Sequence, residues 1–133
     1  MVNSIFTHSS VLGKALDASW LKNNVISNNL SNVDTPNFKA SNVEFQSVFK
    51  NALTNSASSM KKTNEKHMDA NSSTGINPIV TEDTSSTMRM DGNNVDIESE
   101  QVKLAENAIY YNTVLQKLGE EYSRLRYAIS EGK

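Results

Sequence analysis

The sequence has no cysteine, and this absence excludes disulfide bonds and thiolate metal sites. Apolar residues are also scarce for a globular domain, at 37% of 133 residues with a mean hydropathy of −0.52. A chain of this length and composition fits one small domain. Its core is narrow, or is completed by other chains.

Long apolar runs are absent as well. No window of the sequence approaches the length of a transmembrane helix. Residues 1–10 are mostly polar, and no apolar run of the length found in a secretory signal follows them. We therefore expect that, if the protein leaves the cytoplasm, it uses a route without a cleaved signal peptide.

Concentrated basic charge is the third missing feature. The 13 Lys and Arg residues are balanced by 15 Asp and Glu residues, which gives a net charge of −2. The basic residues stand singly or in pairs, so the chain offers neither a basic stripe for nucleic acid nor a polybasic membrane patch. We expect no nucleic-acid partner and no role at a membrane surface.

What the sequence does contain is a heptad-like repeat at each end. The first runs from about residue 9 to 32, where spacings of four and three alternate and predict a helix with one narrow seam. Polar residues within this seam cost stability but can fix the register of helix pairing. The helix is expected to end before Pro36, since the residue ahead of a proline is disfavoured in helical geometry. The seam consists of Leu12, Leu16, Ser19, Asn23, Ile26, Leu30 and Val33.

The second repeat follows the turn at residues 91–94. Asp96 is the expected N-cap of a long helix, and Glu98 and Glu100 in its first turn suit the helix dipole. Because the spacing of this repeat matches that of the first, we predict that the two terminal helices pair in an antiparallel arrangement. The second seam consists of Leu104, Ala108, Tyr111, Leu115, Leu118, Tyr122, Leu125 and Ile129.

A turn and a shorter helix are predicted after the first repeat. At residues 34–39, Pro36 fixes its own backbone angle and Asn37 tolerates the left-handed region. Ser41 and Glu44 have the spacing of a capping box, which predicts a short amphipathic helix over residues 40–53.

The middle of the chain, residues 54–87, is rich in Ser, Thr and Asn. Such a segment buries too little apolar surface to offset its ordering entropy, so alone it is expected to be mobile. Ile76, Ile79 and Val80 are compatible with one short extended piece, and residues 88–90 with one strand.

These features predict a mostly all-α fold. Long N- and C-terminal helices pair as an antiparallel coiled-coil-like hairpin, with a short second helix and an irregular or weakly β middle segment. The expected divisions are residues 1–39, 40–53, 54–87 and 88–133.

No constellation of residues predicts chemistry. His8 and His67 have no obvious Ser, Asp or Cys partner in a rigid element, which argues against a hydrolase triad. Residues 91–96 begin like a calcium loop, but Val95 and Val102 occupy two ligand positions, so the segment is better interpreted as a turn and cap. We therefore predict no catalytic residue, no cofactor, no metal site and no small-molecule substrate.

One long motif remains. Residues 25–39 read Val-Ile-Ser-Asn-Asn-Leu-Ser-Asn-Val-Asp-Thr-Pro-Asn-Phe-Lys, and with Leu-Asp-Ala-Ser-Trp at 16–20 they resemble the N-terminal signature of the flagellar rod and hook family. Asn37 departs from the Gly usual in that family, but tolerates positive φ next best. Residues 90–98 and 125–129 resemble the C-terminal region of a proximal rod subunit. The motif residues are Asn28, Asn29, Asn32, Val33, Asp34, Thr35, Pro36, Phe38 and Lys39.

This resemblance implies a structural, non-enzymatic subunit of the bacterial flagellar basal-body rod that self-assembles by helix packing and transmits torque. It also implies type III export without a cleaved signal and a place in the periplasmic or cell-wall space. The implied partners are the chain itself, FlgC-type and distal rod proteins, the adaptor FliE and the flagellar type III export gate. The expected assembly seam is Leu12, Leu16, Ile26, Leu30, Val33, Leu104, Tyr111, Leu115, Leu118, Tyr122, Leu125 and Ile129.

Two alternatives from other classes stay open at this point. One is a soluble helical adaptor or secretion chaperone, which a stable discrete dimer in the cytoplasm would favour. The other is a small enzyme, which a reproducible thermal shift with a metal or ligand would favour.

Overall fold

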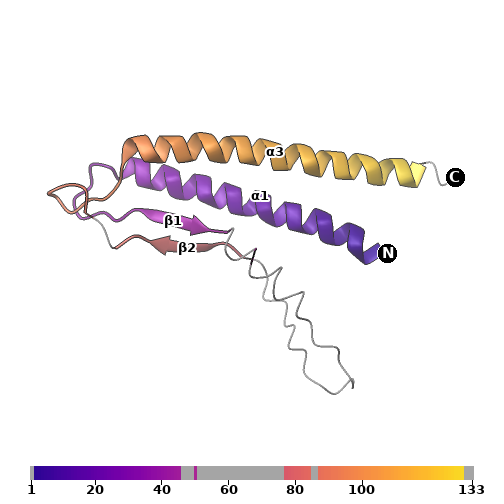
Figure 1. Cartoon of the computed structure of the whole chain (residues 1–133), viewed down its shortest axis with the longest axis horizontal. Coiled ribbons are helices and arrows are strands. Elements are labelled where there is room, and N and C mark those ends of the chain that lie inside the picture. Colours follow the sequence, from indigo (N-terminus) through magenta and orange to yellow (C-terminus); the bar gives the residue numbers. More distant parts are fainter. Residues whose placement is uncertain (1, 46–49, 51–76, 85–86, 131–133) are drawn as a thin grey trace, which may run out of the picture.

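The computed structural model describes residues 2–45, 50, 77–84 and 87–130. Most of this part of the chain belongs to two helices, α1 (Val2–Ser31) and α3 (Ile97–Ser130). They lie side by side and run in opposite directions, so that the start of α1 and the end of α3 are at the same end of the molecule (Figure 1). The predicted antiparallel helical hairpin is confirmed.

Helix α1 is longer than its repeat predicted. It begins at Val2 rather than near residue 9, since residues 2–8 contain no proline or glycine that would interrupt a helix. It ends at Ser31, ahead of Pro36 as expected. In its last turn the backbone N–H of Asn32 donates to the carbonyl of Asn28 at 3.2 Å and to that of Asn29 at 3.1 Å.

A two-stranded antiparallel sheet lies beside α1. Strand β1 (Ser41–Glu44) pairs with β2 (Ile79–Glu82), with Ser41 opposite Glu82 and Glu44 opposite Ile79. The expectation of a helix beginning at Ser41 is therefore wrong for these four residues. Their capping-box spacing is a local preference, and pairing with β2 overrides it. Residues 46–49 and 51–53, the rest of that expected helix, lie outside the described residues.

Strand β2 confirms the extended piece expected at Ile79 and Val80. Ile76, the third residue of that expected piece, and the rest of residues 54–76 lie outside the described residues. The strand expected at residues 88–90 is wrong: the N–H groups of Met88 and Arg89 both donate to the carbonyl of Asn93, at 3.2 and 3.1 Å, and close a turn.

Helix α3 begins directly behind its predicted cap. The Asp96 side chain accepts a hydrogen bond from the N–H of Glu98 at 3.0 Å, which confirms Asp96 as the N-cap. On the exposed side of the helix, Lys117 donates to Glu120 at 3.0 Å. This hydrogen bond from Lys117 lowers the pKa of Glu120 below its ordinary value.

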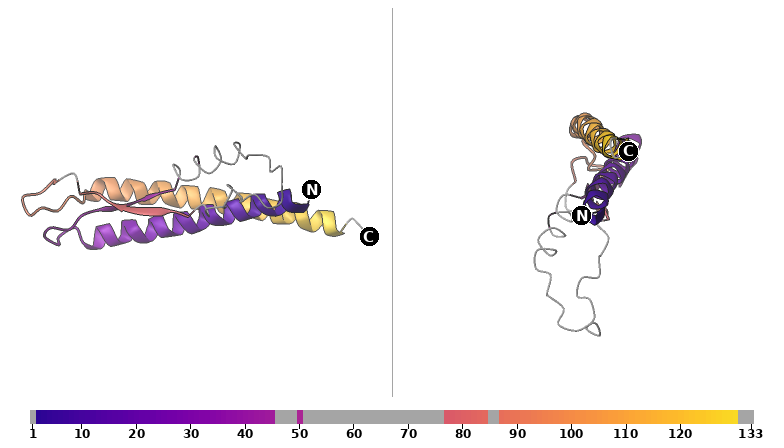
Figure 2. Two further views of the ribbon diagram at one scale, coloured as in Figure 1. Left: turned by 90° about the horizontal axis from the view of Figure 1, so that it is seen from below. Right: turned by 90° about the vertical axis from the view of Figure 1, so that its right-hand side faces the viewer.

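The core is narrow because α1 lies between α3 on one side and β1 on the other (Figures 1 and 2). Small side chains allow the backbones of neighbouring elements to approach closely. None of the helices in the described part of the chain is long and apolar enough to cross a membrane. The buried apolar residues are Ala15, Ala18, Ile26, Ala40, Val95 and Val114.

Candidate assembly site

The face of α3 that packs against α1 is shifted from the predicted seam by one line of residues. Residues seven apart fall on one line of a helix that takes part in coiled-coil packing. The line that contains Glu100, Asn107 and Val114 is buried in the described structure, although none of the three was assigned to the seam. The adjacent line belongs to the predicted seam and is mostly half-buried; it consists of Leu104, Tyr111, Leu118 and Leu125.

The third line of α3, which we call the outer column, consists of Ala108, Leu115, Tyr122 and Ile129. All four residues are exposed, and the exposed fraction rises along the helix from 47% at Leu115 to 57% at Tyr122 and 76% at Ile129. The predicted seam combined this outer column with the half-buried line. The structure brings only the half-buried line near α1 and leaves the outer column at the surface.

In α1, more of the predicted seam is buried or half-buried than in α3. Ile26 and Ser19 are each only 3% exposed, whereas Asn23, the other polar residue of the seam, is exposed. Leu12, Leu16, Leu30 and Val33 are half-buried.

Two buried polar pairs join α1 to α3. The Ser19 hydroxyl donates to Asn107 Oδ1 at 2.8 Å, and Asn107 Nδ2 donates to the Ser19 carbonyl at 2.9 Å. Each residue therefore satisfies the buried polar groups of the other. The second pair lies ten residues after Ser19 in α1 and seven residues before Asn107 in α3. There, Asn29 Nδ2 donates to Glu100 Oε2 at 3.0 Å. These pairs explain why the line of α3 that contains Glu100 and Asn107 faces α1.

Asn29 also connects α1 to the sheet. Its amide donates to the Ser41 carbonyl at 2.8 Å and accepts from the Ser41 N–H at 3.0 Å, so it pairs with the backbone as a neighbouring strand would. Asn29 is 1% exposed and Glu100 is 2% exposed. Lys103 donates to Glu100 Oε1 at 2.6 Å, which compensates the buried carboxylate. The side chain of Asn29 in α1 therefore contacts both β1 and α3.

The turn after α1 meets the loop before α3, and we call these two segments, residues 32–40 and 87–95, the junction. Its centre is Asn93, which is 0% exposed. Asn93 Nδ2 lies 2.9 Å from each of three carbonyl oxygens, those of Asn32, Val33 and Thr35. Its Oδ1 accepts from the N–H of Val95 at 2.7 Å. A single amide thus holds the backbone of the whole turn.

Two residues of the junction have left-handed backbone angles. Asn37 has φ 59° and Gly92 has φ 82°, which confirms the left-handed turn expected at Asn37. The N–H of Asn37 donates to the Asp91 carbonyl at 2.9 Å, and Lys39 Nζ donates to the Gly92 carbonyl at 2.9 Å. The motif turn and the loop are therefore joined through both backbone and side chain.

Arg89 closes the exposed side of the junction. Its guanidinium donates to the Val33 carbonyl at 2.9 Å and to Asp34 Oδ1 at 3.3 Å, and Nε lies 3.7 Å from Asp91 Oδ2. The Arg89 and Asp34 side chains are 47% and 87% exposed, so solvent screens this ion pair and its contribution is small.

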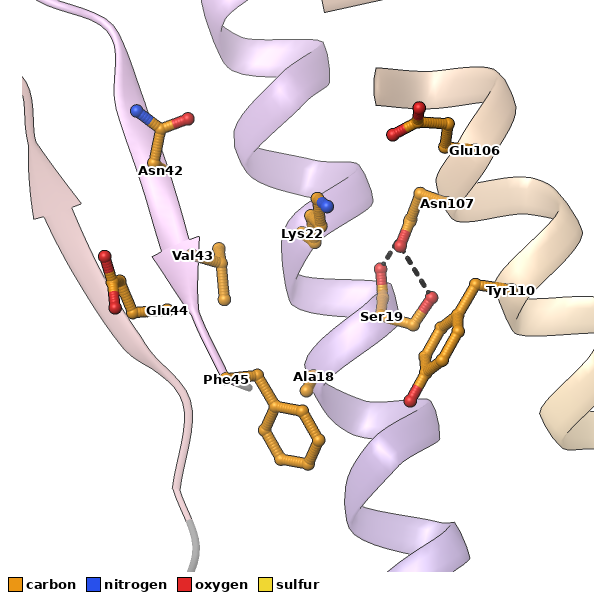
Figure 3. A pocket seen from close by; sticks show the side chains of 10 residues that line it. All are labelled: Ala18, Ser19, Lys22, Asn42, Val43, Glu44, Phe45, Glu106, Asn107 and Tyr110. Carbon is orange, nitrogen blue, oxygen red and sulfur yellow. Dashed lines mark hydrogen bonds between the residues drawn. The ribbon is translucent and has the colours of Figure 1, made fainter. Parts of the chain in front are cut away.

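A groove of about 700 Å³ opens between β1 and α3, with α1 as its floor (Figure 3). Val43 and Phe45 approach from the β1 side, and Asn107 and Tyr110 from α3. Among the described residues, no group of three His, Asp or Glu side chains could hold a metal ion.

The model of the family described as flagella basal body rod protein matches residues 11–39. Over 124 residues, the chain is 34% identical to the flagellar basal body rod protein FlgB of Bacillus subtilis strain 168, and the match covers 92% of each chain. FlgB of Borreliella burgdorferi is 37% identical over 103 residues, covering 73% of this chain and 76% of its own. The chain belongs to the flagellar basal body rod protein family.

Within the rod family, a more distant relative has the same extent. FlgB of Yersinia enterocolitica is 26% identical over 124 residues, which covers 90% of both chains. The family is structural, so the chain is a structural subunit of the flagellar basal body rod and has no enzymatic role. These comparisons give no support to the adaptor or chaperone alternative.

The remaining rod-motif residues belong to the same turn. Asn32 Nδ2 donates to the carbonyl and the side chain of Asn28, at 2.8 and 3.1 Å, and Asn32 Oδ1 accepts from the Thr35 hydroxyl at 3.2 Å. Pro36 is exposed and Phe38 is half-buried. Sequence reasoning missed Asn94 as a support: its Oδ1 accepts from Ala40 N–H at 2.7 Å, and its Nδ2 donates to the Asp83 carbonyl at 2.8 Å.

Asn107 and Glu100 were also missed, although a signal was present. They lie seven residues apart, and Val114 continues the same spacing. The predicted seam of α3 followed the spacing of apolar and aromatic residues, so it did not include this partly polar line. The polar Ser19 in the opposite seam was the hint that a polar partner was required.

Proposed function

We propose that this rod subunit belongs to the proximal part of the rod and packs there against neighbouring rod subunits through the exposed part of the assembly seam. The relatives named FlgB support the assignment to one branch of the family. The single observation that supports packing through the seam is the outer column, in which Leu115, Tyr122 and Ile129 are exposed on one line of α3.

The proposed partners are other copies of the chain, FlgC-type and distal rod proteins, the adaptor FliE and the type III export gate. The proposed location is the periplasmic or cell-wall part of the basal body. Long helices packed side by side resist twisting better than chains joined by loops, which suits torque transmission. Rod assembly would bury the outer column and add apolar area that the isolated chain cannot bury by itself.

The motif turn has a separate role in this proposal. Asn28, Asn29, Asn32 and the residues up to Lys39 act as an internal brace, since their side chains form hydrogen bonds with other residues of the chain. They set the angle at which the sheet and the hairpin leave the junction. Neighbouring subunits would then contact the helices and not the motif itself.

The experiment is the isolation of basal bodies from cells that carry an epitope-tagged chain. We expect the tagged chain to co-purify with basal bodies. We also expect its incorporation to require FliE but not the distal rod and hook proteins. Incorporation that is lost without the distal proteins, or that persists without FliE, would contradict the proximal position.

A second measurement concerns the isolated chain. We expect purified protein to be monomeric or weakly associating and to gain helix content on assembly, because its outer column lacks a partner in solution. Sedimentation and circular dichroism test this. A stable discrete dimer would instead favour an adaptor.

A further inference from the structure

We propose that Asp91 is a covalent modification site, at which aspartate isomerises to isoaspartate, and that the closed junction protects this site. The pair Asp91–Gly92 lies in the loop before α3, at the end of the hairpin opposite the start of α1 and the end of α3 (Figure 1). The sequence contains this one Asp–Gly pair and no Asn–Gly pair. The inference does not depend on where the subunit lies in the rod.

The reaction needs only water and the chain itself. The backbone nitrogen of Gly92 attacks Cγ of the Asp91 carboxyl group, a C–N bond forms, and the amide proton leaves with the carboxyl hydroxyl as water. Water then adds to one carbonyl of the cyclic succinimide and breaks its C–N bond. Opening at the main-chain carbonyl gives isoaspartate, whose main chain runs through Cβ and Cγ. Glycine favours the attack, because it has no Cβ to hinder the approach of its nitrogen.

In the folded chain, both reacting groups have partners. Asp91 Oδ1 accepts from the N–H of Asn93 at 3.1 Å, and Oδ2 lies 3.7 Å from Arg89 Nε. The N–H of Gly92 donates to the Arg89 carbonyl at 3.1 Å. Ring closure turns the carboxyl group onto this nitrogen, so these contacts must break first. The folded junction therefore opposes the reaction, although water reaches the Asp91 side chain, which is 32% exposed.

The backbone on both sides of the reacting bond is also held. The Asp91 carbonyl accepts from the Asn37 N–H at 2.9 Å, and the Gly92 carbonyl accepts from Lys39 Nζ at 2.9 Å. These bonds fix the loop against the motif turn and limit rotation about the Asp91–Gly92 segment. The rate in the folded chain therefore depends on the fraction of molecules in which the junction has opened locally.

Isomerisation would in turn prevent the junction from closing. Isoaspartate adds one carbon to the main chain between residues 91 and 92, and the former main-chain carbonyl becomes part of a charged carboxylate. The acceptors of Asn37 and Lys39 then no longer have the spacing of the motif turn. Asn93, whose amide holds three carbonyls of that turn, follows the lengthened loop. The modification thus separates chains with a closed junction from chains that have stayed open.

The test is ageing of the purified full-length chain in warm, neutral buffer, with and without concentrated guanidinium chloride. After the denaturant is removed, a protease that cleaves before aspartate but not before isoaspartate, followed by mass spectrometry, gives the isomerised fraction at residue 91. We expect isoaspartate to form at least about tenfold more slowly in buffer than in denaturant. Equal rates in the two solutions, or isoaspartate at other aspartates but not at residue 91, would overturn the proposal.

Three variants separate local protection from overall stability. Arg89→Ala removes the guanidinium beside Asp91 and should raise the rate in buffer about threefold, since an exposed ion pair contributes weakly. Lys117→Ala, which removes an exposed ion pair in the middle of α3, is the matched control and should leave the rate unchanged. Asp91→Glu should give no product, because glutamate would have to close a larger ring. An equal rise in the Arg89 and Lys117 variants, or in neither, would contradict protection by the junction.

A second measurement tests the effect of isomerisation on the junction. The chain is aged in denaturant, returned to buffer and unfolded with urea under circular dichroism. We expect a second population that unfolds at lower urea, with an amplitude equal to the isomerised fraction at residue 91. A chain exposed only briefly to the same denaturant is the control. A single transition at the position of this control, in a sample that contains isoaspartate at residue 91, would show that the modified junction still closes.

Discussion

Asn37 and Gly92, the two left-handed residues of the junction, lie directly against each other. A Cβ atom on Gly92 would stand 2.6 Å from Asn37 Oδ1, closer than a real Cβ contact allows. Any side chain at position 92 therefore requires the Asn37 side chain to move. This relationship leads to the first prediction.

Gly92→Ala should destabilise the chain by about 1–2 kcal/mol, because the new methyl group clashes with Asn37 and alanine disfavours positive φ. Asn37→Gly should be neutral or mildly stabilising, and it should reduce the cost of Gly92→Ala when the two are combined. Urea unfolding followed by circular dichroism measures all three variants.

The control for this series is Gly119→Ala. Gly119 lies in α3 with nothing within 4 Å of its added Cβ, so alanine should stabilise the helix by about 0.5–1 kcal/mol. Asn37→Val should destabilise the chain, since a β-branched residue rarely adopts positive φ. A Gly92→Ala variant as stable as the unmodified chain would show that the close contact relaxes without cost.

Asn93→Asp should be one of the most damaging isosteric substitutions in the chain. It replaces the amide nitrogen, which faces three carbonyl oxygens at 2.9 Å, by an oxygen that carries part of a negative charge. The loss of three contacts and the repulsion in a buried site predict a cost of about 3 kcal/mol or more. Urea unfolding tests this prediction, with exposed Asn112→Asp as the matched control. Equal stability of the two variants would contradict it.

The Ser19–Asn107 pair should show strong coupling in a double-mutant cycle. Ser19→Ala and Asn107→Ala each leave a polar group of the partner unsatisfied in a buried interface, at about 1–2 kcal/mol apiece. The double variant should cost less than the sum, with a coupling energy of about 1 kcal/mol. Thermal unfolding of the four proteins measures the coupling, and strict additivity would mean that the pair contributes nothing beyond its separate side chains.

Leu115→Asp and Ile26→Asp should separate assembly from folding. Ile26 is 3% exposed, so a carboxylate there has no solvent and should unfold the isolated hairpin at a cost of several kcal/mol. Leu115 is 47% exposed, so the isolated chain should tolerate aspartate. In the rod, however, the outer column would be buried, and Leu115→Asp should abolish motility.

Circular dichroism of the purified variants and swimming assays distinguish the two effects. Ile109→Asp is the matched control for Leu115→Asp, because Ile109 is 70% exposed and lies outside the outer column. Swimming cells that carry Leu115→Asp would show that the outer column is not an assembly contact.

The sequence by itself determined the elements whose causes are local. Heptad spacing specifies both long helices, Pro36 limits the first, and Asp96 caps the second through a contact two residues away. The left-handed angle at Asn37 belongs to this group, since it depends on the residue and its neighbours. The antiparallel direction followed from two matching repeats joined by a connecting segment.

Only the tertiary structure decided which side of α3 faces α1 and which secondary structure Ser41–Glu44 adopt. Asn29 and Glu100 are 71 residues apart in sequence, and Ser19 and Asn107 are 88 apart. Apolar spacing favours the column with Leu115 and Tyr122, but burial of these two polar pairs rotates α3 away from it. Likewise, the capping-box spacing of Ser41 and Glu44 is overridden by hydrogen bonds from Asn29 and β2. The spacing of polar residues along one helix does not say which distant residue each of them will meet, so only the folded chain reveals these hydrogen bonds.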